Sequence, residues 1–144
     1  MNNNKILAPS LLSADFSDLN GALKQIENLG GQWVHIDVMD GVFVPQITYG
    51  QPVISSIRKK SQLVFDVHLM IVHSEQAIES FKNAGADYIT FHYEACVHHH
   101  RVIEQIHQLG CKAGISIVPS TPVTVLQEIL PYVDLVLVMT VNPG

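Results

Sequence analysis

Six short apolar runs recur along the chain, and longer stretches of mixed polar and apolar residues separate them. The runs are rich in Ile, Val, Leu and Phe, as expected of strands that are buried on both faces of a sheet. We therefore predict strands over residues 5–9, 33–39, 63–71, 88–93, 112–118 and 133–139.

Four of the intervening stretches have apolar residues three or four positions apart, which is the periodicity of an amphipathic helix. Ser17 and Ser74 stand at the start of the first two stretches, where a hydroxyl can cap a helix. Gly85 and Gly110 follow the second and third, and Pro122 lies near the start of the fourth. The predicted helices cover residues 17–29, 74–84, 99–109 and 121–131.

Strands that alternate with helices predict an α/β fold with a parallel sheet and right-handed crossovers, in a single domain. Two architectures fit this alternation, a (β/α)8 TIM barrel and an open doubly wound sheet. No G-x-G-x-x-G segment follows the first predicted strand, which argues against a dinucleotide-binding open sheet. Polar residues recur at the carboxyl ends of the strands, where a barrel places its active site, at Ser10, Asp37, His68 and His92.

The spacing of the strands bears on which part of such a barrel is present. One strand–helix repeat takes about 26 residues, so eight repeats would need roughly 205 residues, near the lower end of the usual range. We expect residues 1–144 to form an incomplete barrel with about six of its eight βα units, or else a sheet that does not close.

Composition narrows the function classes. With 47% hydrophobic and 15% charged residues, the 144-residue chain is expected to fold as a globular domain. Its net charge of −5 argues against a nucleic-acid partner. No apolar run approaches the ~18 residues of a membrane span, and no secretory signal opens the sequence. Cys96 and Cys111 lack metal-type spacing, so we expect free thiols in a cytoplasmic protein without a membrane partner.

Two predicted strands carry metal-binding residue types at alternating positions. Side chains alternate faces along a strand, so His35 and Asp37 share one face, as do Asp66 and His68. If both faces point into one barrel mouth, His35, Asp37 and His68 converge on a site suited to Zn²⁺, Fe²⁺, Co²⁺ or Mn²⁺. Asp66 would orient a ligand from behind. The alternative is a set of buried polar groups that satisfy one another, but the joint pattern favours a metal.

Other polar and sulfur-containing residues near the strand ends have simpler interpretations. Each of Met39, Met70 and Met139 lies at a strand end. These methionines either fill the core or form a flexible apolar lid over a small polar substrate. Ser10 by itself indicates no more than a helix or turn cap, and His92 is best explained as a hydrogen-bonded core histidine.

Two further motifs carry weak signals. The histidine tract at 98–100 falls at the start of a predicted helix and is expected to be a solvated face. The "VNPG" segment at 141–144 could begin a phosphate-binding turn built from backbone N–H groups.

Five segments taken together resemble the ribulose-phosphate 3-epimerase family, and the resemblance runs in order along essentially the whole chain. They are "APSLLSADF", "HIDVMDGVFVPQITYG", "FDVHLMI", "AGADYITFHYEA" and "VDLVLVMTVNPG". The D-x-M-D-G-x-F-V-P and D-V-H-L-M patterns are highly specific to that family. Its members are (β/α)8 barrels that interconvert ribulose 5-phosphate and xylulose 5-phosphate in the pentose phosphate pathway.

The resemblance implies a role for each matching residue. His35, Asp37 and His68 match ligands of one divalent metal ion, and Asp37 matches one of two catalytic acid–base aspartates. The reaction would epimerise the sugar phosphate at C3 through a cis-enediolate stabilised by the metal. The positions that match substrate-binding residues are Ser10, His35, Met39, His68, Met70, Met139 and Gly144.

The sequence also departs from the family pattern. The second aspartate, which is also the fourth ligand, belongs to a V-D-G-G segment that would follow residue 144, as would the rest of the N-P-G-F-G-G-Q loop. Val118 stands where the family usually has asparagine. We therefore expect residues 1–144 alone to have little or no epimerase activity.

Two alternatives to this function stay open at this stage. One is a sister epimerase that acts on a ketose 6-phosphate such as allulose 6-phosphate. The other is a non-catalytic truncated barrel that serves as an assembly module, and whether the protein forms a homo-oligomer is equally open.

Overall fold

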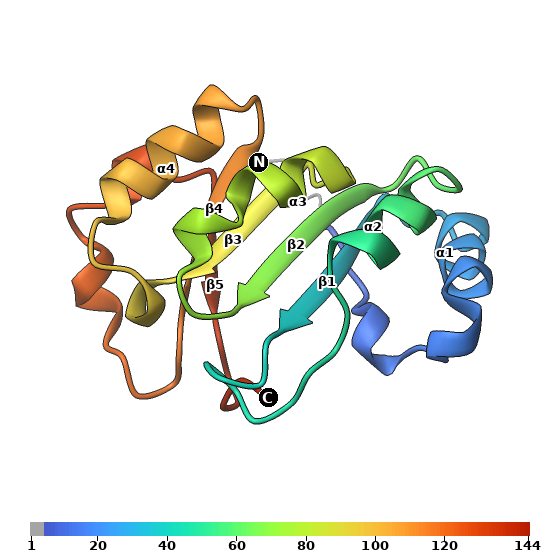
Figure 1. Cartoon of the computed structure of the whole chain (residues 1–144), viewed down its shortest axis with the longest axis horizontal. Helices are drawn as coiled ribbons and strands as arrows, with labels where there is room; N and C mark the ends of the chain where they lie inside the picture. Colours follow the sequence, from blue (N-terminus) through green and yellow to red (C-terminus); the bar gives the residue numbers. More distant parts are fainter. Residues whose placement is uncertain (1–4) are drawn as a thin grey trace.

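The computed structural model describes residues 5–144, in which five parallel strands form one curled sheet (Figure 1). The strands are neighbours in the order of the chain, which is the order of a barrel, whereas a doubly wound sheet reverses its order at a switch point. The prediction of a parallel α/β sheet that forms part of a barrel is therefore confirmed. The strands are β1 (Trp33–Met39), β2 (Val64–Met70), β3 (Tyr88–His92), β4 (Lys112–Ile117) and β5 (Leu135–Val138).

Helices cover one face of this sheet. Within the described part of the chain the α-helices are α1 (Leu19–Asn28), α2 (Gln51–Arg58), α3 (Ile78–Ala84) and α4 (His99–Gln108). Figure 1 shows α2, α3 and α4 following the curve of the sheet, and α3 contacts both of the other two. Helix α3 ends at Gly85, whose φ of 113° is favourable for glycine, and a Cβ there would lie 2.3 Å from Cγ of Arg58.

The two faces of the sheet differ in chemistry because side chains alternate along each strand. The face toward the helices is apolar and forms the core with residues such as Ile36, Phe65 and Ile89, which are fully buried. The opposite face is lined by polar side chains, and the parallel register places Asp37 beside His68 and Thr90 beside Gly114. The polar residues on this face are His35, Asp37, Asp66, His68, Thr90, His92 and Ser116.

The strand expected over residues 5–9 is not formed, and this prediction is wrong. The segment runs beside β1, but its pairing is limited to an isolated bridge between Ser10 and His35. Beside this bridge, the N–H of His35 donates to the carbonyl oxygen of Pro9 at 2.9 Å. Proline has no N–H to extend the ladder, and residues 5–9 are exposed.

Both predicted serine caps are also wrong. Helix α1 begins at Leu19, two residues after the start of the predicted range, and the carboxylate of Asp18 caps it by accepting from the N–H of Gly21 at 2.9 Å. Ser17 instead donates its hydroxyl to Asp15. Helix α3 begins only at Ile78, because Ser74 lies inside a short 3-10 helix (Ser74–Gln76).

The helix predicted over residues 121–131 is replaced by two 3-10 helices, η5 (Val123–Leu126) and η6 (Leu130–Tyr132). The first contains the β-branched run Val123–Thr124–Val125, which disfavours an α-helix, and Pro131 would interrupt one. Conversely, α2 was not among the predicted ranges. Pro52 starts its first turn after Gly50.

No helix in residues 5–144 is both long and apolar enough to cross a membrane.

Candidate functional site

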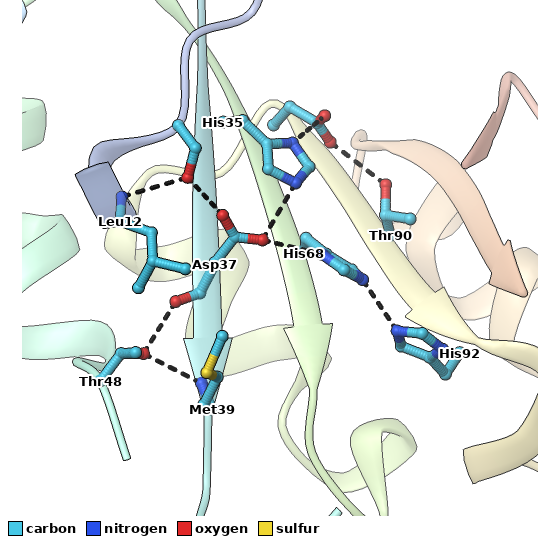
Figure 2. A network of polar contacts seen from close by, with 10 residues as sticks. Leu12, His35, Asp37, Met39, Thr48, His68, Thr90 and His92 are labelled. Carbon is cyan, nitrogen blue, oxygen red and sulfur yellow. Dashed lines mark hydrogen bonds and ion pairs between the residues drawn. The ribbon is translucent and has the colours of Figure 1, made fainter. Parts of the chain in front are cut away.

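Three of the predicted site residues converge on the polar face of the sheet, near the carboxyl ends of β1 and β2. One nitrogen of His35, one nitrogen of His68 and one carboxylate oxygen of Asp37 all lie within 4.8 Å of one another (Figure 2). Alternation along β1 brings His35 and Asp37 to the same face, and the parallel register brings His68 beside Asp37.

Asp37 is the centre of this cluster. Its Oδ1 lies 2.9 Å from Nδ1 of His68 and 3.2 Å from Nε2 of His35. Its Oδ2 accepts a hydrogen bond from the hydroxyl of Ser10, which in turn accepts one from the N–H of Leu12 at 3.1 Å. Burial by itself would raise the pKa of Asp37, but the contacts with His35, His68 and Ser10 hold that pKa far below its usual range. Asp37 is therefore ionised.

His35 lies between two carboxylates. Its Nε2 faces Asp37, and its Nδ1 lies 2.8 Å from Oδ2 of Asp66, as predicted for a carboxylate that orients this histidine. Burial lowers the pKa of His35, but the hydrogen bonds and charges of the two aspartates outweigh it and raise the pKa to about 10. The cluster thus holds a positive charge on His35 at neutral pH.

Asp66 is in turn fixed from β3. The hydroxyl of Thr90 donates to Oδ1 of Asp66 at 3.1 Å, and both residues are buried. The close approach depends on Gly114 in the neighbouring strand, because a Cβ there would lie 2.2 Å from Oγ1 of Thr90. The second carboxylate of the site is therefore held by a buried contact that spans two strands.

His68 is held through another histidine. Its Nε2 lies 2.9 Å from Nε2 of His92, and Nδ1 of His92 lies 3.1 Å from Oε2 of Glu94 (Figure 2 shows the two rings). Burial lowers the pKa of His92 to about 4, and repulsion from the His68 ring whenever that ring is protonated acts in the same direction, although Glu94 opposes the shift. His92 is fully buried with both ring nitrogens in contact, so the prediction of a hydrogen-bonded core histidine is confirmed.

The donor set suits a divalent cation of the borderline class. Two imidazole nitrogens and a carboxylate oxygen are ligands that Zn²⁺, Fe²⁺, Co²⁺ and Mn²⁺ share. The remaining nitrogen of His35 is hydrogen-bonded to a carboxylate, which is the usual support for a metal-binding histidine. A cation could take the place of the proton that His35 directs at Asp37.

The structure separates the three predicted methionines. Met39 and Met70 are register partners and form a small buried cluster with Val44, and Phe43 packs against it. Met139 follows β5, is partly exposed and is not a member of this cluster.

Gly144, also predicted at the substrate site, lies against the loop after β1. A Cβ there would approach the Cβ of Val44 to 2.8 Å. Its φ of 88° is one that glycine adopts readily.

Sequence reasoning missed the residues that shape this loop. The carboxylate of Asp40 accepts from the N–H groups of Val42, Phe43 and Val72, so it joins the loops that follow β1 and β2. Thr48 donates to the carbonyl oxygen of Asp37 at 2.8 Å. A carboxylate directly after a strand was the available signal for Asp40, whereas nothing local indicated Thr48.

The histidine tract is mostly solvated, as expected. His98 and His100 are exposed, whereas His99 is partly buried and stacks on the ring of Tyr93 at 4.2 Å. Cys96 and Cys111 are free thiols, also as predicted.

Comparison with known proteins supports the same family throughout the chain. The sequence is 62% identical over 138 residues to ribulose-phosphate 3-epimerase of Treponema pallidum (strain Nichols), covering 96% of this chain and 63% of that protein. It is 49% identical to ribulose-phosphate 3-epimerase of Bacillus subtilis (strain 168), covering 96% and 64% respectively. The chain thus spans somewhat less than two thirds of the length of these relatives.

A solved structure adds evidence on the fold alone. The chain superposes on 3-hexulose-6-phosphate synthase with a TM-score of 0.58 at 16% identity, covering 94% of this chain and 63% of that one. The sequence model described as "Ribulose-phosphate 3 epimerase family" matches residues 6–144. This match covers nearly the whole chain, including the cluster on β1 and β2. The chain therefore belongs to the ribulose-phosphate 3-epimerase family.

Proposed function

We propose that the protein is an epimerase that interconverts D-ribulose 5-phosphate and D-xylulose 5-phosphate, with a divalent metal ion held by His35, Asp37 and His68. The observation that carries the proposal is the convergence of these three side chains within 4.8 Å in a chain of this family. The names of the relatives support the reaction, and the donor set supports the metal.

Epimerisation at C3 breaks the C3–H bond and later forms it again on the opposite face of the carbon. The electron pair of the broken bond moves toward the C2 carbonyl, so negative charge develops on the substrate oxygens. A divalent cation held by His35, Asp37 and His68 would supply Lewis acidity, which would stabilise this charge and make the C3 proton acidic enough for a weak base.

Asp37 is the base that we assign to one face of the substrate. Its carboxylate is ionised at neutral pH because His35, His68 and Ser10 all stabilise the charged form. Oδ1 is engaged by the two histidines, so Oδ2 is the oxygen that would take the proton from C3. The Ser10 hydroxyl donates to that oxygen, and in the proposed reaction it would turn toward a substrate oxygen instead.

A two-sided proton transfer needs a second acid across from Asp37. Within residues 5–144, the other carboxylate in contact with the metal-binding residues is Asp66, and it is engaged by His35 and Thr90. We therefore expect residues 1–144 expressed by themselves to bind the metal ion but to show little or no epimerase turnover.

The test is a coupled assay of the purified protein with D-ribulose 5-phosphate, run metal-free and then with Co²⁺, Zn²⁺, Fe²⁺ or Mn²⁺. In a protein as long as its relatives we expect turnover that requires the metal and that falls with Asp37→Asn, whereas residues 1–144 by themselves should show little or none. D-allulose 6-phosphate assayed in parallel distinguishes a sister epimerase, which would prefer it. Metal binding without turnover of either sugar phosphate by a protein as long as its relatives would contradict an epimerase.

A further inference from the structure

A continuous chain of polar contacts leaves the proposed metal site and ends at Glu94, which follows β3 and is bonded to the loop after β4. It runs from Asp37 to His68, from His68 to His92 and from His92 to Glu94. The three contacts measure 2.9, 2.9 and 3.1 Å. His92 and Glu94, the last two residues of this chain of contacts, are not among the residues assigned above to the metal or the substrate.

The number of ring hydrogens limits how this chain can be arranged. Each of the three contacts needs one hydrogen between its two atoms, and the two end groups are carboxylates that accept only. A histidine binds a metal ion as a neutral imidazole. In that state His68 and His92 supply two ring hydrogens, so one of the three contacts is left with facing lone pairs. The vacant contact is a position for a cation, and its location depends on which nitrogens carry the hydrogens.

Glu94 determines that location. Its Oε1 accepts from the N–H of Val118 at 2.9 Å and from the hydroxyl of Thr121, which fixes the carboxylate to the loop after β4. Burial by itself raises the pKa of Glu94, but the hydrogen bonds from these donors outweigh burial and lower the pKa. The carboxyl group is therefore ionised at neutral pH. Its Oε2 therefore accepts a hydrogen from Nδ1 of His92.

The consequence passes along the chain. With its hydrogen on Nδ1, neutral His92 has a bare Nε2, which can only accept. Nε2 of His68 must then donate to it across 2.9 Å, which leaves Nδ1 of His68 bare. That nitrogen lies 2.9 Å from Oδ1 of Asp37, and Nε2 of His35 contacts the same oxygen.

We propose that Glu94 and His92 are positioning residues that set the tautomer of His68, so that its Nδ1 is free to bind the divalent cation beside Asp37. The inference rests on the proposed metal site, and it assigns a role to two residues on β3 and the segment after it. It also explains why a core histidine adjoins a carboxylate anchored on another loop.

A purely structural network would satisfy the same groups without fixing a hydrogen on any one nitrogen. Direct observation of the tautomer separates the two explanations. Ring ¹⁵N chemical shifts of ¹⁵N-histidine-labelled protein identify which nitrogen of each histidine carries a hydrogen. We expect His92 to be protonated at Nδ1 and bare at Nε2 with and without Zn²⁺, and Zn²⁺-loaded His68 to carry its hydrogen on Nε2.

The variant Glu94→Gln tests the direction of the effect. Its carbonyl oxygen can keep the N–H of Val118, and its amide N–H then faces His92, so the hydrogens of His92 and His68 move to their other nitrogens. We expect Co²⁺ affinity, measured by competition with a chelator, to fall at least about tenfold, as for other partners of metal-binding histidines.

Two controls separate this effect from damage to the fold. Thr121→Val removes a donor to Glu94 but leaves its contact with His92, so it should lower Co²⁺ affinity less than Glu94→Gln does. Glu104→Gln changes an exposed glutamate of α4 and should leave the affinity unchanged. Circular dichroism must show that each variant is folded.

The outcomes are distinct. A hydrogen on Nε2 of His92 in the wild type overturns the inference, as does a folded Glu94→Gln variant with wild-type affinity and unchanged ring shifts. Absence of Co²⁺ binding by the wild type would refute the proposed function. The tautomer of His92 would still decide whether Glu94 sets the position of the hydrogen on His68.

Discussion

The two histidines of the site are supported in different ways. His35 on β1 contacts its carboxylate directly, through the 2.8 Å contact with Asp66. His68 on β2 reaches Glu94 only through His92. The side chain of Asp66 is 6% exposed and is anchored within the sheet by Thr90, whereas the side chain of Glu94 is 24% exposed and is anchored to a loop.

This difference has a physical consequence. A buried carboxylate in direct contact exerts its charge and its hydrogen bond on the same ring, so its removal affects both. A carboxylate that acts through a second imidazole sets the position of a hydrogen but is further from the ligand and better screened. We therefore expect the β1 side to be the stronger support and the β2 side to be the more adjustable one.

The largest effect is expected where the two sides meet. Asp37→Asn removes the charge shared by His35 and His68 and should weaken Co²⁺ binding by more than about 100-fold, the upper end for partners that are not themselves ligands. Isothermal titration against a chelator measures it. Asp15→Asn is the matched control, since Asp15 is exposed and asparagine also caps well. A loss below tenfold in Asp37→Asn would remove Asp37 from the ligand set.

Asp66→Asn tests the direct side alone. The substitution leaves His35 without its carboxylate partner and Thr90 with a weaker acceptor, so Co²⁺ affinity should fall by about 10- to 100-fold. We expect this loss to exceed that of Glu94→Gln in the same assay. Equal losses, or a larger one for Glu94→Gln, would break the proposed difference between the two sides.

The charge on His35 predicts a pH dependence of the metal-free protein. Between Asp37 and Asp66 its pKa is raised to about 10 from 6.5, so its stabilisation is fully present below pH 6.5 and is lost as the pH rises through 10. Thermal melting of wild type and His35→Gln across this range should show their difference in melting temperature shrinking as pH rises. A difference that is constant with pH would contradict the charge on His35.

The smallest effect is expected for Thr90→Val, which removes the hydroxyl that donates to Asp66 while nearly keeping the side-chain volume. The free energy of unfolding should fall by about 1–2 kcal/mol because a buried carboxylate oxygen loses its donor. Co²⁺ affinity should fall less than with Asp66→Asn. Thr124→Val, at an exposed position of η5, is the control for urea denaturation.

The sequence was informative where one element decides the outcome. Alternation along β1 and β2 correctly grouped His35 with Asp37 and Asp66 with His68, because strand geometry fixes those faces. The expected parallel sheet followed from the repeated strand–helix pattern. Helix boundaries were less accurate, because Ser17 and Asp18 are both good caps and the structure uses the second.

Features that depend on several elements could not be predicted. The role suggested for Glu94 depends on Val118 and Thr121, which lie 24 and 27 residues away in the sequence. The segment 5–9 has a strand-like composition, but whether it pairs depends on the neighbours available to it. Met139 is separated from Met39 and Met70 because it follows β5, which lies at the opposite edge of the sheet from β1.

The account's central claim is that a divalent cation binds between β1 and β2. Anomalous diffraction at the cobalt edge, from crystals of Co²⁺-loaded protein in which His98→Gln and His100→Gln remove the two exposed histidines of the tract, locates the ion directly. We predict one strong peak in contact with His35, Asp37 and His68. A peak elsewhere, or no peak beside Asp37 at saturating Co²⁺, would contradict the claim.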